Sequence, residues 1–352
     1  MHDADEPGRF RTLDLIDAHA GGDVGRVVVG GVELPAGTAA ERARMLQRDG
    51  DGLRRLLTQK PHGDPSQCVD LLLPPSTPEA HAGLVIMGTM GYPGFSGSNA
   101  MCAAAAMVEA RLVPLPDPED DLLLETPAGL TRLTLTARRG RLDSVAYDAL
   151  PGFAVPGDHV TEVEGWGRVR FRLVYGGVFY AVVNAAEVGL DPARTPVSEL
   201  ARFFDAFLPR AAGEHELVHP EHGVMPPLSL GLLAGTVDLQ PEQPRVDLAV
   251  YMDGGVICRG PTGTGTTALL VWLHEQGRIA PGATVRAVSP FGQEFTGTLT
   301  GTTAVGDRTG VRTRIAGRPY LLARSQIIID SDDPLVDGHD LPRGPSPAPG
   351  TS

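Results

Sequence analysis

The chain has 352 residues, of which 42% are hydrophobic, and a formal net charge of −13. The length predicts two domains, and the apolar content suffices for a buried core. The negative charge argues against a nucleic-acid partner and against an anionic membrane surface. The acidic start lacks a secretion-signal pattern, and no apolar run is long enough to span a membrane. The three cysteines lie far apart in the sequence. We therefore expect a cytoplasmic protein without disulfides.

The first half of the chain predicts strands interrupted by two helical stretches. Strand-like runs of apolar and β-branched residues occupy 12–16, 26–34, 69–73, 82–87, 122–125, 131–137 and 144–150. Helical spacing of apolar residues covers 39–57, although two glycines interrupt it. A second helix is expected over about 100–112, with Ser98 or Asn99 as its N-cap.

The second half repeats the order of strand, small-residue turn and helix. Its predicted strands lie at 169–174, 178–183 and 246–252, within 284–315, and at 320–329; its predicted helices are 197–207 and about 264–275. The repetition predicts an internal duplication. The stretch 338–352 is rich in proline, glycine and serine, which predicts a disordered tail.

Two glycine-bearing turns, each leading into an apolar helix, look like copies of one another. They read Ser96-Gly97-Ser98-Asn99-Ala100-Met101-Cys102 and Arg259-Gly260-Pro261-Thr262-Gly263-Thr264-Gly265. A helix entrance offers unpaired N–H groups and the positive end of the helix dipole, which together suit a carboxylate. Each turn is expected to place one proton-handling side chain there, Cys102 or Thr262.

Cys102 has two interpretations. A thiol at a helix N-terminus has a pKa below its usual ~8.5, so a thiolate is available near neutral pH. The alternative is a small buried hydrophobic residue, which is the commoner role of a cysteine inside a helix. The alanines that follow it leave space around the thiol and favour the functional interpretation.

Two further motifs are weak. Residues 263–268 match the dinucleotide fingerprint G-x-G-x-x-A, but no acidic residue follows at the required distance of about 20 residues. His215 and His219 match the zinc pattern H-E-x-x-H, which needs both histidines on one helical face. Pro220 follows at once and Gly213 precedes, so a chance match is the better interpretation, and no metal is expected.

The chain resembles the proline racemase family, which includes hydroxyproline epimerases and trans-3-hydroxy-L-proline dehydratases. The resemblance extends from about Leu13 to Ile329. It is carried by Asp17-Ala18-His19-Ala20-Gly21-Gly22, Tyr175-Gly176-Gly177-Val178-Phe179-Tyr180, Pro261-Thr262-Gly263-Thr264-Gly265-Thr266 and Ser289-Pro290-Phe291-Gly292-Gln293-Glu294-Phe295-Thr296-Gly297. Together these blocks form a specific signal.

The resemblance implies an α/β (α+β) fold of two pseudo-symmetric halves, similar to diaminopimelate epimerase. Each half would be a curved mixed sheet around a central helix, with the active site in the cleft between the halves. The first half would comprise residues 10–165 and 316–332 and carry Cys102, and the second would comprise residues 166–315 and carry Thr262. We expect a small amino acid as the ligand and no cofactor. A homodimer is the assembly that we consider.

The residue at position 262 bears on the reaction. Racemases of the family use two cysteines, one per half: one thiolate removes the α-proton and the opposite thiol returns a proton. Cys102 matches the first cysteine, and Thr262 stands where the second would be. A hydroxyl is a much weaker acid than a thiol, so two-base inversion is handicapped. Cysteine with threonine accompanies dehydratase activity in the family, so we expect α-proton abstraction by Cys102 followed by loss of a β-hydroxyl as water.

Substrate contacts are implied at both turns. The polar side chains of Ser98 and Asn99 lie in the first turn. The backbone N–H groups of Ala103, Gly263 and Thr264 would hold the carboxylate and the charge that develops in the transition state.

Two departures from the family pattern leave the substrate open. Ala104 stands where many members have a histidine that helps bind the ring nitrogen. Cys258 stands where many have an aspartate that contacts the amino group, and Asp253 is a candidate replacement. The alternatives are therefore a racemase or epimerase that uses Cys258 or water as its second acid, and a degenerate member that binds an amino acid without turnover.

Overall fold

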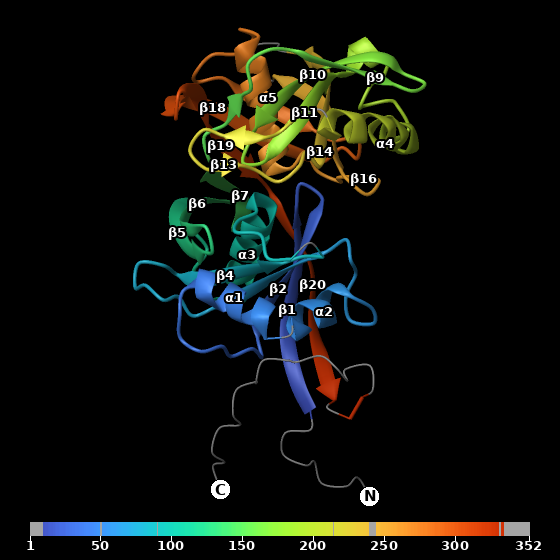
Figure 1. The fold of residues 1–352 in the computed structure, drawn as a ribbon. Helices are drawn as coiled ribbons and strands as arrows, with labels where there is room; N and C mark the ends of the chain where they lie inside the picture. Colours follow the sequence, from blue (N-terminus) through green and yellow to red (C-terminus); the bar gives the residue numbers. More distant parts are fainter. Residues whose placement is uncertain are drawn as a thin grey trace, which may run out of the picture. The chain divides into compact units, whose positions relative to one another are not determined.

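The computed structural model describes residues 10–49, 51–89, 91–213, 215–238, 244–330, 332 and 333. The tail expected to be disordered, 338–352, lies outside these residues. The chain forms two compact units (Figure 1). The first takes the chain up to Ala20, then Val24–Val145 and the chain from Arg318; the second takes Gly21–Asp23 and Ala146–Gly317. The chain therefore passes from the first unit to the second after Val145, whereas the boundary expected from the sequence lies after residue 165.

Among its described residues, the first unit has eight strands and three helices. They are β1 (Phe10–Ala20), β2 (Asp23–Gly30), α1 (Ala39–Arg48), α2 (Gly52–Thr58), β3 (Cys68–Leu73), β4 (Ala82–Met87), α3 (Gly97–Glu109), β5 (Glu119–Thr126), β6 (Gly129–Arg138), β7 (Arg141–Asp148), whose end belongs to the second unit, and β20 (Pro319–Asp330). Figure 1 shows β1 in blue and β20 in red side by side, and they pair antiparallel from Phe10–Asp330 to Ala20–Pro319. The two ends of the described chain thus close this unit together.

The second unit contains the remaining elements. They are β8 (Phe153–Ala154), β9 (His159–Val163), β10 (Gly167–Tyr175), β11 (Phe179–Asn184), the 3₁₀ helix η1 (Ala185–Val188), α4 (Val197–Gly213), β12 (Val218–His219), β13 (Gly223–Val224), β14 (Leu230–Asp238), β15 (Arg245–Met252), β16 (Val256–Ile257), α5 (Gly263–Glu275), β17 (Thr284–Val288), β18 (Glu294–Val305) and β19 (Arg308–Gly317). Within the described residues, no helix is long and apolar enough to cross a membrane.

The duplication expected from the sequence is present in the strand pairing. In the first unit β2–β3 is parallel, β3–β4 antiparallel, β4–β5 parallel and β5–β6 antiparallel. In the second unit the same order recurs in β11–β14, β14–β15, β15–β17 and β17–β18. A parallel pair needs a crossover connection. The crossover between β4 and β5 carries α3, and the one between β15 and β17 carries α5.

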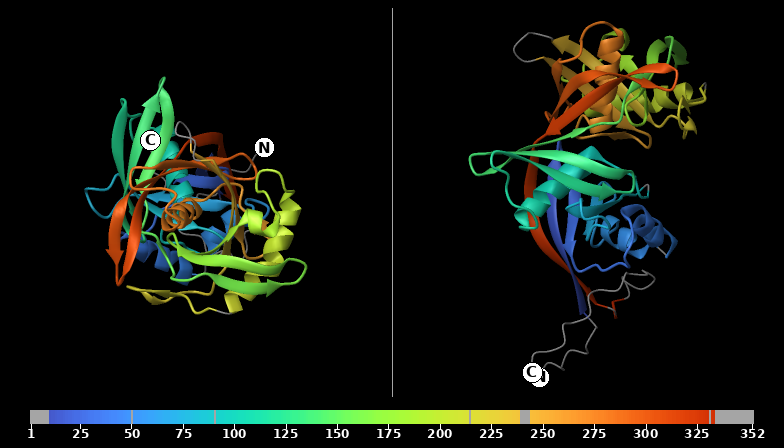
Figure 2. Two further views of the ribbon diagram at one scale, coloured as in Figure 1. Left: turned by 90° about the horizontal axis from the view of Figure 1, so that it is seen from above. Right: turned by 90° about the vertical axis from the view of Figure 1, so that its left-hand side faces the viewer.

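The two crossover helices are the buried centres of their units. Each has 13 residues, and residues 97–107 of α3 and most of α5 are buried. A helix that is apolar on all sides needs neighbours all round it. Figure 2 (left) looks along α5, which packs against β8, β10, β11, β18 and β19. The expected arrangement of a mixed sheet around a central helix is therefore confirmed in each unit.

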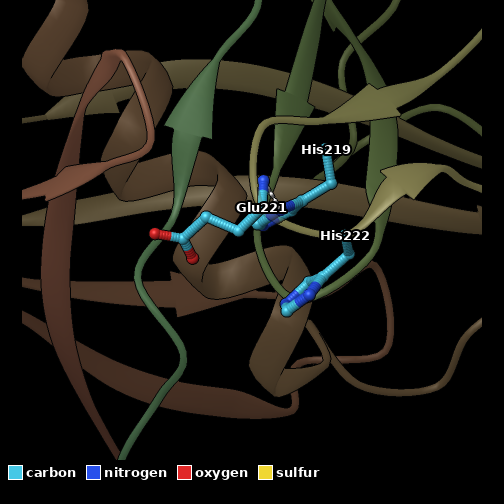
Figure 3. Close-up of side chains that lie close together, drawn as sticks. All are labelled: His219, Glu221 and His222. Atoms are coloured by element: carbon cyan, nitrogen blue, oxygen red, sulfur yellow. Dashed lines mark hydrogen bonds between the residues drawn. The ribbon is translucent and has the colours of Figure 1, made fainter.

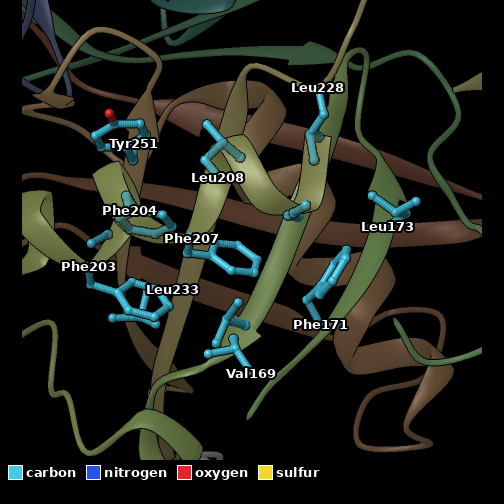
Figure 4. Close-up of a cluster of buried hydrophobic side chains, with 14 of the residues drawn as sticks. Val169, Phe171, Leu173, Phe203, Phe204, Phe207, Leu208, Leu228, Leu233 and Tyr251 are labelled. Carbon is cyan, nitrogen blue, oxygen red and sulfur yellow. The ribbon is translucent and has the colours of Figure 1, made fainter. Parts of the chain in front are cut away.

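An aromatic cluster holds α4 against the sheet of the second unit (Figure 4). Phe203, Phe204 and Phe207 of α4 are fully buried, and they contact one another and the rings of Phe171 and Tyr251. Burying a large apolar side chain stabilises the fold by roughly 1.5–3 kcal/mol. This cluster anchors the face of the sheet opposite to α5.

The helical stretch expected at 39–57 is two helices instead of one. Asp51 separates them with a left-handed φ of 62°, which non-glycine residues rarely adopt. Its carboxylate accepts hydrogen bonds from the Arg54 guanidinium and from the Tyr92 hydroxyl. These bonds hold the turn between α1 and α2.

Candidate active site

The entrance of α3 lies three residues earlier than the sequence suggested. The chain bends at Gly94, so the helix begins at Gly97 with extended Ser96 as its N-cap. The Ala100 N–H donates to the Ser96 carbonyl over 2.9 Å. Cys102 is consequently the sixth residue of α3 and is fully buried. The residue at the entrance is Ser96, and the predicted position of Cys102 there is wrong.

Cys102 faces β2 inside the first unit. A Cβ atom added to Gly25 would lie 2.9 Å from the Cys102 Cβ and 2.4 Å from an Asp70 carboxyl oxygen. Such distances are shorter than real side chains tolerate, so only glycine fits at this position. The thiol thus sits in a closely packed layer behind the helix entrance.

The entrance of α5 is formed by Thr262, as the sequence predicted. Its hydroxyl accepts a hydrogen bond from the Gly265 N–H over 2.9 Å. Its backbone has φ 52° and ψ 153°, and strain of this kind, which costs of order 1–3 kcal/mol, is concentrated at functional sites. The buried Tyr180 hydroxyl lies 3.3 Å from the Thr262 hydroxyl and 2.7 Å from that of Thr264. Burial raises the pKa of Tyr180 to about 12, so this phenol stays protonated.

Cys258 and Asp253, two of the proposed substrate contacts, are not set up to act as bases. Burial, and then the charge of Asp23, raises the pKa of the Cys258 thiol to about 12, so it is neutral near pH 7. Asp253 is exposed in the turn between β15 and β16, where its carboxylate accepts from the Gly254 N–H over 3.0 Å. Neither group therefore supplies a ready base at the α5 entrance.

The two entrances correspond residue for residue. Ser96-Gly97-Ser98 precedes and starts α3 as Thr262-Gly263-Thr264 does for α5. Sequence reasoning missed Ser96 because several adjacent residues are good N-caps. The signal that could have found it is the glycine that directly follows each N-cap residue, although only the Thr262 side chain makes a capping hydrogen bond.

This helix start also moves the expected carboxylate contacts. The unpaired N–H groups of a helix belong to its first turn, here residues 97–99, which include Ser98 and Asn99. Ala103 and Ala104 are fully buried in the helix interior, where N–H groups bond to carbonyls four residues earlier. Ala103 and Ala104 thus lie beyond the first turn of α3, whereas Gly263 and Thr264 lie in the first turn of α5.

The histidine pair of the H-E-x-x-H pattern is not helical. His215 follows the end of α4, and His219 lies in β12. His219, Glu221 and His222 do gather ligand atoms within 4.8 Å (Figure 3). However, the two imidazoles stack at 4.3 Å, the His219 Nδ1 accepts from the Glu221 N–H, and the Glu221 carboxylate accepts from the Gly306 N–H. Stacked rings direct their lone pairs side by side, which does not suit a shared ion.

Comparisons with known proteins show which family the chain belongs to. The Proline racemase family matches residues 15–340. A 4-hydroxyproline 2-epimerase of Agrobacterium fabrum is 36% identical over 331 residues, covering 93% of this chain and 95% of the relative. A protein of Chromohalobacter salexigens is 39% identical over 328 residues, covering 93% and 91%.

Solved structures show the same likeness. A hydroxyproline epimerase from Agrobacterium vitis, solved with bound trans-4-hydroxy-L-proline, superposes with a TM-score of 0.79 at 33% identity and covers 94% of this chain and 95% of that one. A phenazine biosynthesis protein of the PhzF family from Bacillus anthracis shares the fold alone, with a TM-score of 0.58 at 12% identity. The chain is an enzyme that belongs to the proline racemase family.

Proposed function

We propose that the protein removes and returns the α-proton of a proline-type amino acid, as a hydroxyproline 2-epimerase does. The observation that carries the proposal is the matched pair of helix entrances, each capped by a hydroxyl residue. The N–H groups of each first turn are donors of the kind that suits a carboxylate and the charge that develops on it. Relatives named 4-hydroxyproline 2-epimerase support a ring amino acid as substrate.

In this proposal Ser96 and Thr262 are the proton-handling residues. Gly97 follows Ser96 in the same way as Gly263 follows Thr262. Ser96 rather than Cys102 then occupies the first catalytic position. A free hydroxyl is a weak base, so the positive end of each helix dipole has to stabilise its alkoxide form. Tyr180 contacts Thr262 and Asn99 contacts Ser96, and these contacts orient the two hydroxyls.

The second candidate is trans-3-hydroxy-L-proline dehydratase activity. Thr262 favours it, because a residue that returns a proton poorly leaves elimination of a β-hydroxyl as the easier outcome. The carbanion would expel hydroxide, which leaves as water after protonation, and the enamine would tautomerise to pyrroline-2-carboxylate. The sequence suggested Cys102 as the base for this dehydration.

Proton NMR in D₂O separates these reactions. The full chain is incubated with trans-4-hydroxy-L-proline, L-proline and trans-3-hydroxy-L-proline in parallel. Epimerisation gives loss of the α-proton signal and a new diastereomer of the 4-hydroxy compound, whereas dehydration consumes the 3-hydroxy compound. Binding without either change would identify a degenerate member and refute both activities.

Three variants assign the base. We expect Ser96→Ala and Thr262→Ala each to slow exchange by about 100-fold or more. Cys102→Ala should remain within a few-fold of the wild type, because the thiol is buried behind the entrance. Loss of exchange in Cys102→Ala with retention in Ser96→Ala would overturn this assignment and restore the thiol as base.

A further inference from the structure

A buried carboxyl lies directly behind the entrance of α3. Asp70 is in the middle of β3, opposite Val27 of β2 and Ile86 of β4, and is 0% exposed. Among the described residues no arginine, lysine or histidine forms an ion pair with it. Burying an unpaired carboxylate is costly, and burial accordingly raises the pKa of Asp70 well above its ordinary value.

Asn99 connects this carboxyl to Ser96. With Asp70 ionised, only the second of the two amide orientations below satisfies both amide atoms, and the first needs a proton on Asp70. In one, the Asn99 Nδ2 donates to the Ser96 Oγ over 2.9 Å. In the other, the Nδ2 donates to both Asp70 carboxyl oxygens over 3.3 Å, and the Asn99 Oδ1 accepts from the Ser96 hydroxyl over 2.9 Å. Asn99 is 6% exposed, so water offers it little alternative.

The protonation state of Asp70 selects between these orientations. A neutral Asp70 can donate its proton toward the Asn99 Oδ1, which leaves the Nδ2 to donate to Ser96. An ionised Asp70 accepts only, so the amide must turn its Nδ2 toward it and present its Oδ1 to Ser96. In the first state the Ser96 proton can go to a ligand or to the Ser98 hydroxyl, which lies 3.4 Å away, and in the second state the Ser96 lone pairs can accept.

We propose that Asp70 and Asn99 are positioning residues that set the hydrogen-bond polarity of the Ser96 hydroxyl. The proton on Asp70 decides whether Ser96 donates to the ligand or accepts from it. We call the chain of hydrogen bonds from Asp70 through Asn99 to Ser96 the relay. No proton passes through its amide, and no covalent bond is made or broken within it. The catalytic consequence rests on the proposed function, because a group that both takes and returns an α-proton must act in both senses.

The surroundings of Asp70 limit what else could titrate with it. Gly25 of β2, and Asn99 and Cys102 of α3, converge on its carboxyl. Cys68 is two residues earlier in β3 and so points to the same face of the sheet. Both thiols are titratable groups on this side of the sheet, and the test includes variants of both.

The first test follows the protonation of Asp70 and the response of Asn99 by NMR, without substrate turnover. In the full chain labelled with ¹³C-aspartate and ¹⁵N-asparagine, Asp70 and Asn99 are assigned by Asp70→Asn and Asn99→Ala. We expect the Asp70 carboxyl and the Asn99 side-chain amide to titrate with one shared midpoint, unchanged in Cys68→Ser and Cys102→Ala. An Asn99 amide that ignores the Asp70 titration, or a carboxyl that stays protonated from about pH 5 to about pH 10, would overturn the proposal.

The second test measures α-proton exchange as a function of pH. Asp70→Asn keeps the shape and removes the titration, so it should lower kcat about 10-fold with KM little changed and abolish one limb of the pH profile. In the Ser96→Ala background it should have no further effect. Glu125→Gln is the control, because Glu125 is another buried carboxyl of this unit and contacts Ser76 and Ala39 instead.

The outcomes distinguish the two proposals. An Asp70→Asn enzyme with the wild-type pH profile, or one that loses the same factor with and without Ser96, would overturn the relay while leaving the proposed function intact. If the wild type exchanges no α-proton, the proposed function fails, and the NMR titration still decides the relay.

Discussion

Gly263→Ala should damage the second unit in spite of adding a good helix former. In an open helical position, replacing glycine by alanine stabilises by roughly 0.5–1 kcal/mol. At Gly263 the new Cβ would lie 1.9 Å from the hydroxyl oxygen of Tyr147, which is 3% exposed. An ordinary contact needs about 3.4 Å, so one group must move by about 1.5 Å. Overpacking of this kind typically costs ~1–3 kcal/mol, and we expect a net loss of about 2 kcal/mol.

The assay is urea unfolding of the full chain followed by tryptophan fluorescence. Both tryptophans, Trp166 and Trp272, belong to the second unit, so the signal reports on the unit that carries Gly263. The matched control is Gly213→Ala at the end of α4, where an added Cβ has no neighbour within 4 Å. That variant should be neutral or slightly stabilised.

A second substitution tests the reason for the loss. Tyr147→Phe removes the hydroxyl, after which the nearest ring atom is 3.3 Å from the added Cβ. The hydroxyl has its own interactions, so this variant alone should lose about 1 kcal/mol. Gly263→Ala combined with Tyr147→Phe should then be more stable than Gly263→Ala alone, which is a coupling of about 1–2 kcal/mol. Strict additivity of the two changes would refute the steric argument.

Three further predictions concern titratable groups. Glu125→Gln should lower the melting temperature followed by circular dichroism, with a loss of about 1–3 kcal/mol, because an amide cannot accept all the bonds that Ser76 and the start of α1 donate; an unchanged melting temperature would contradict this. Burial, followed by the charge of His215, lowers the pKa of His159, so stability should fall as pH drops below the unfolded value of ~6.5 and stop falling below the folded pKa. Unfolding midpoints at about pH 7.5 and about pH 5 should show this, and the fall should shrink in His159→Phe. The alkylation rate of Cys258, measured by difference from Cys258→Ser, should still rise tenfold per pH unit above about pH 9, and a plateau near pH 8.5 would contradict the raised pKa.

Long apolar runs and repeated turns were enough to predict the secondary structure that surrounds the site. The strand expected at 82–87 has those bounds, because all six residues are buried and such a run has few alternatives. The duplication could also be recognised from the sequence, because glycine-bearing turns before apolar helices recur in both halves. Thr262 was placed correctly by its motif.

The start of α3 was decided by tertiary structure. Ser96, Ser98 and Asn99 are nearly equal as N-caps, so local preference leaves a three-residue uncertainty. The bend at Gly94 and the burial of the helix from Gly97 onward settle it, and this moves Cys102 from the entrance into the core.

Asp70 illustrates the same limit at longer range. In the sequence it is one polar residue inside an apolar strand, 29 positions before Asn99. Only the packing of α3 across β2 and β3 brings its carboxyl to the amide, at a place where Gly25 leaves room. Sequence pattern determines which faces are buried, whereas contacts between polar groups far apart in the chain depend on how those faces meet.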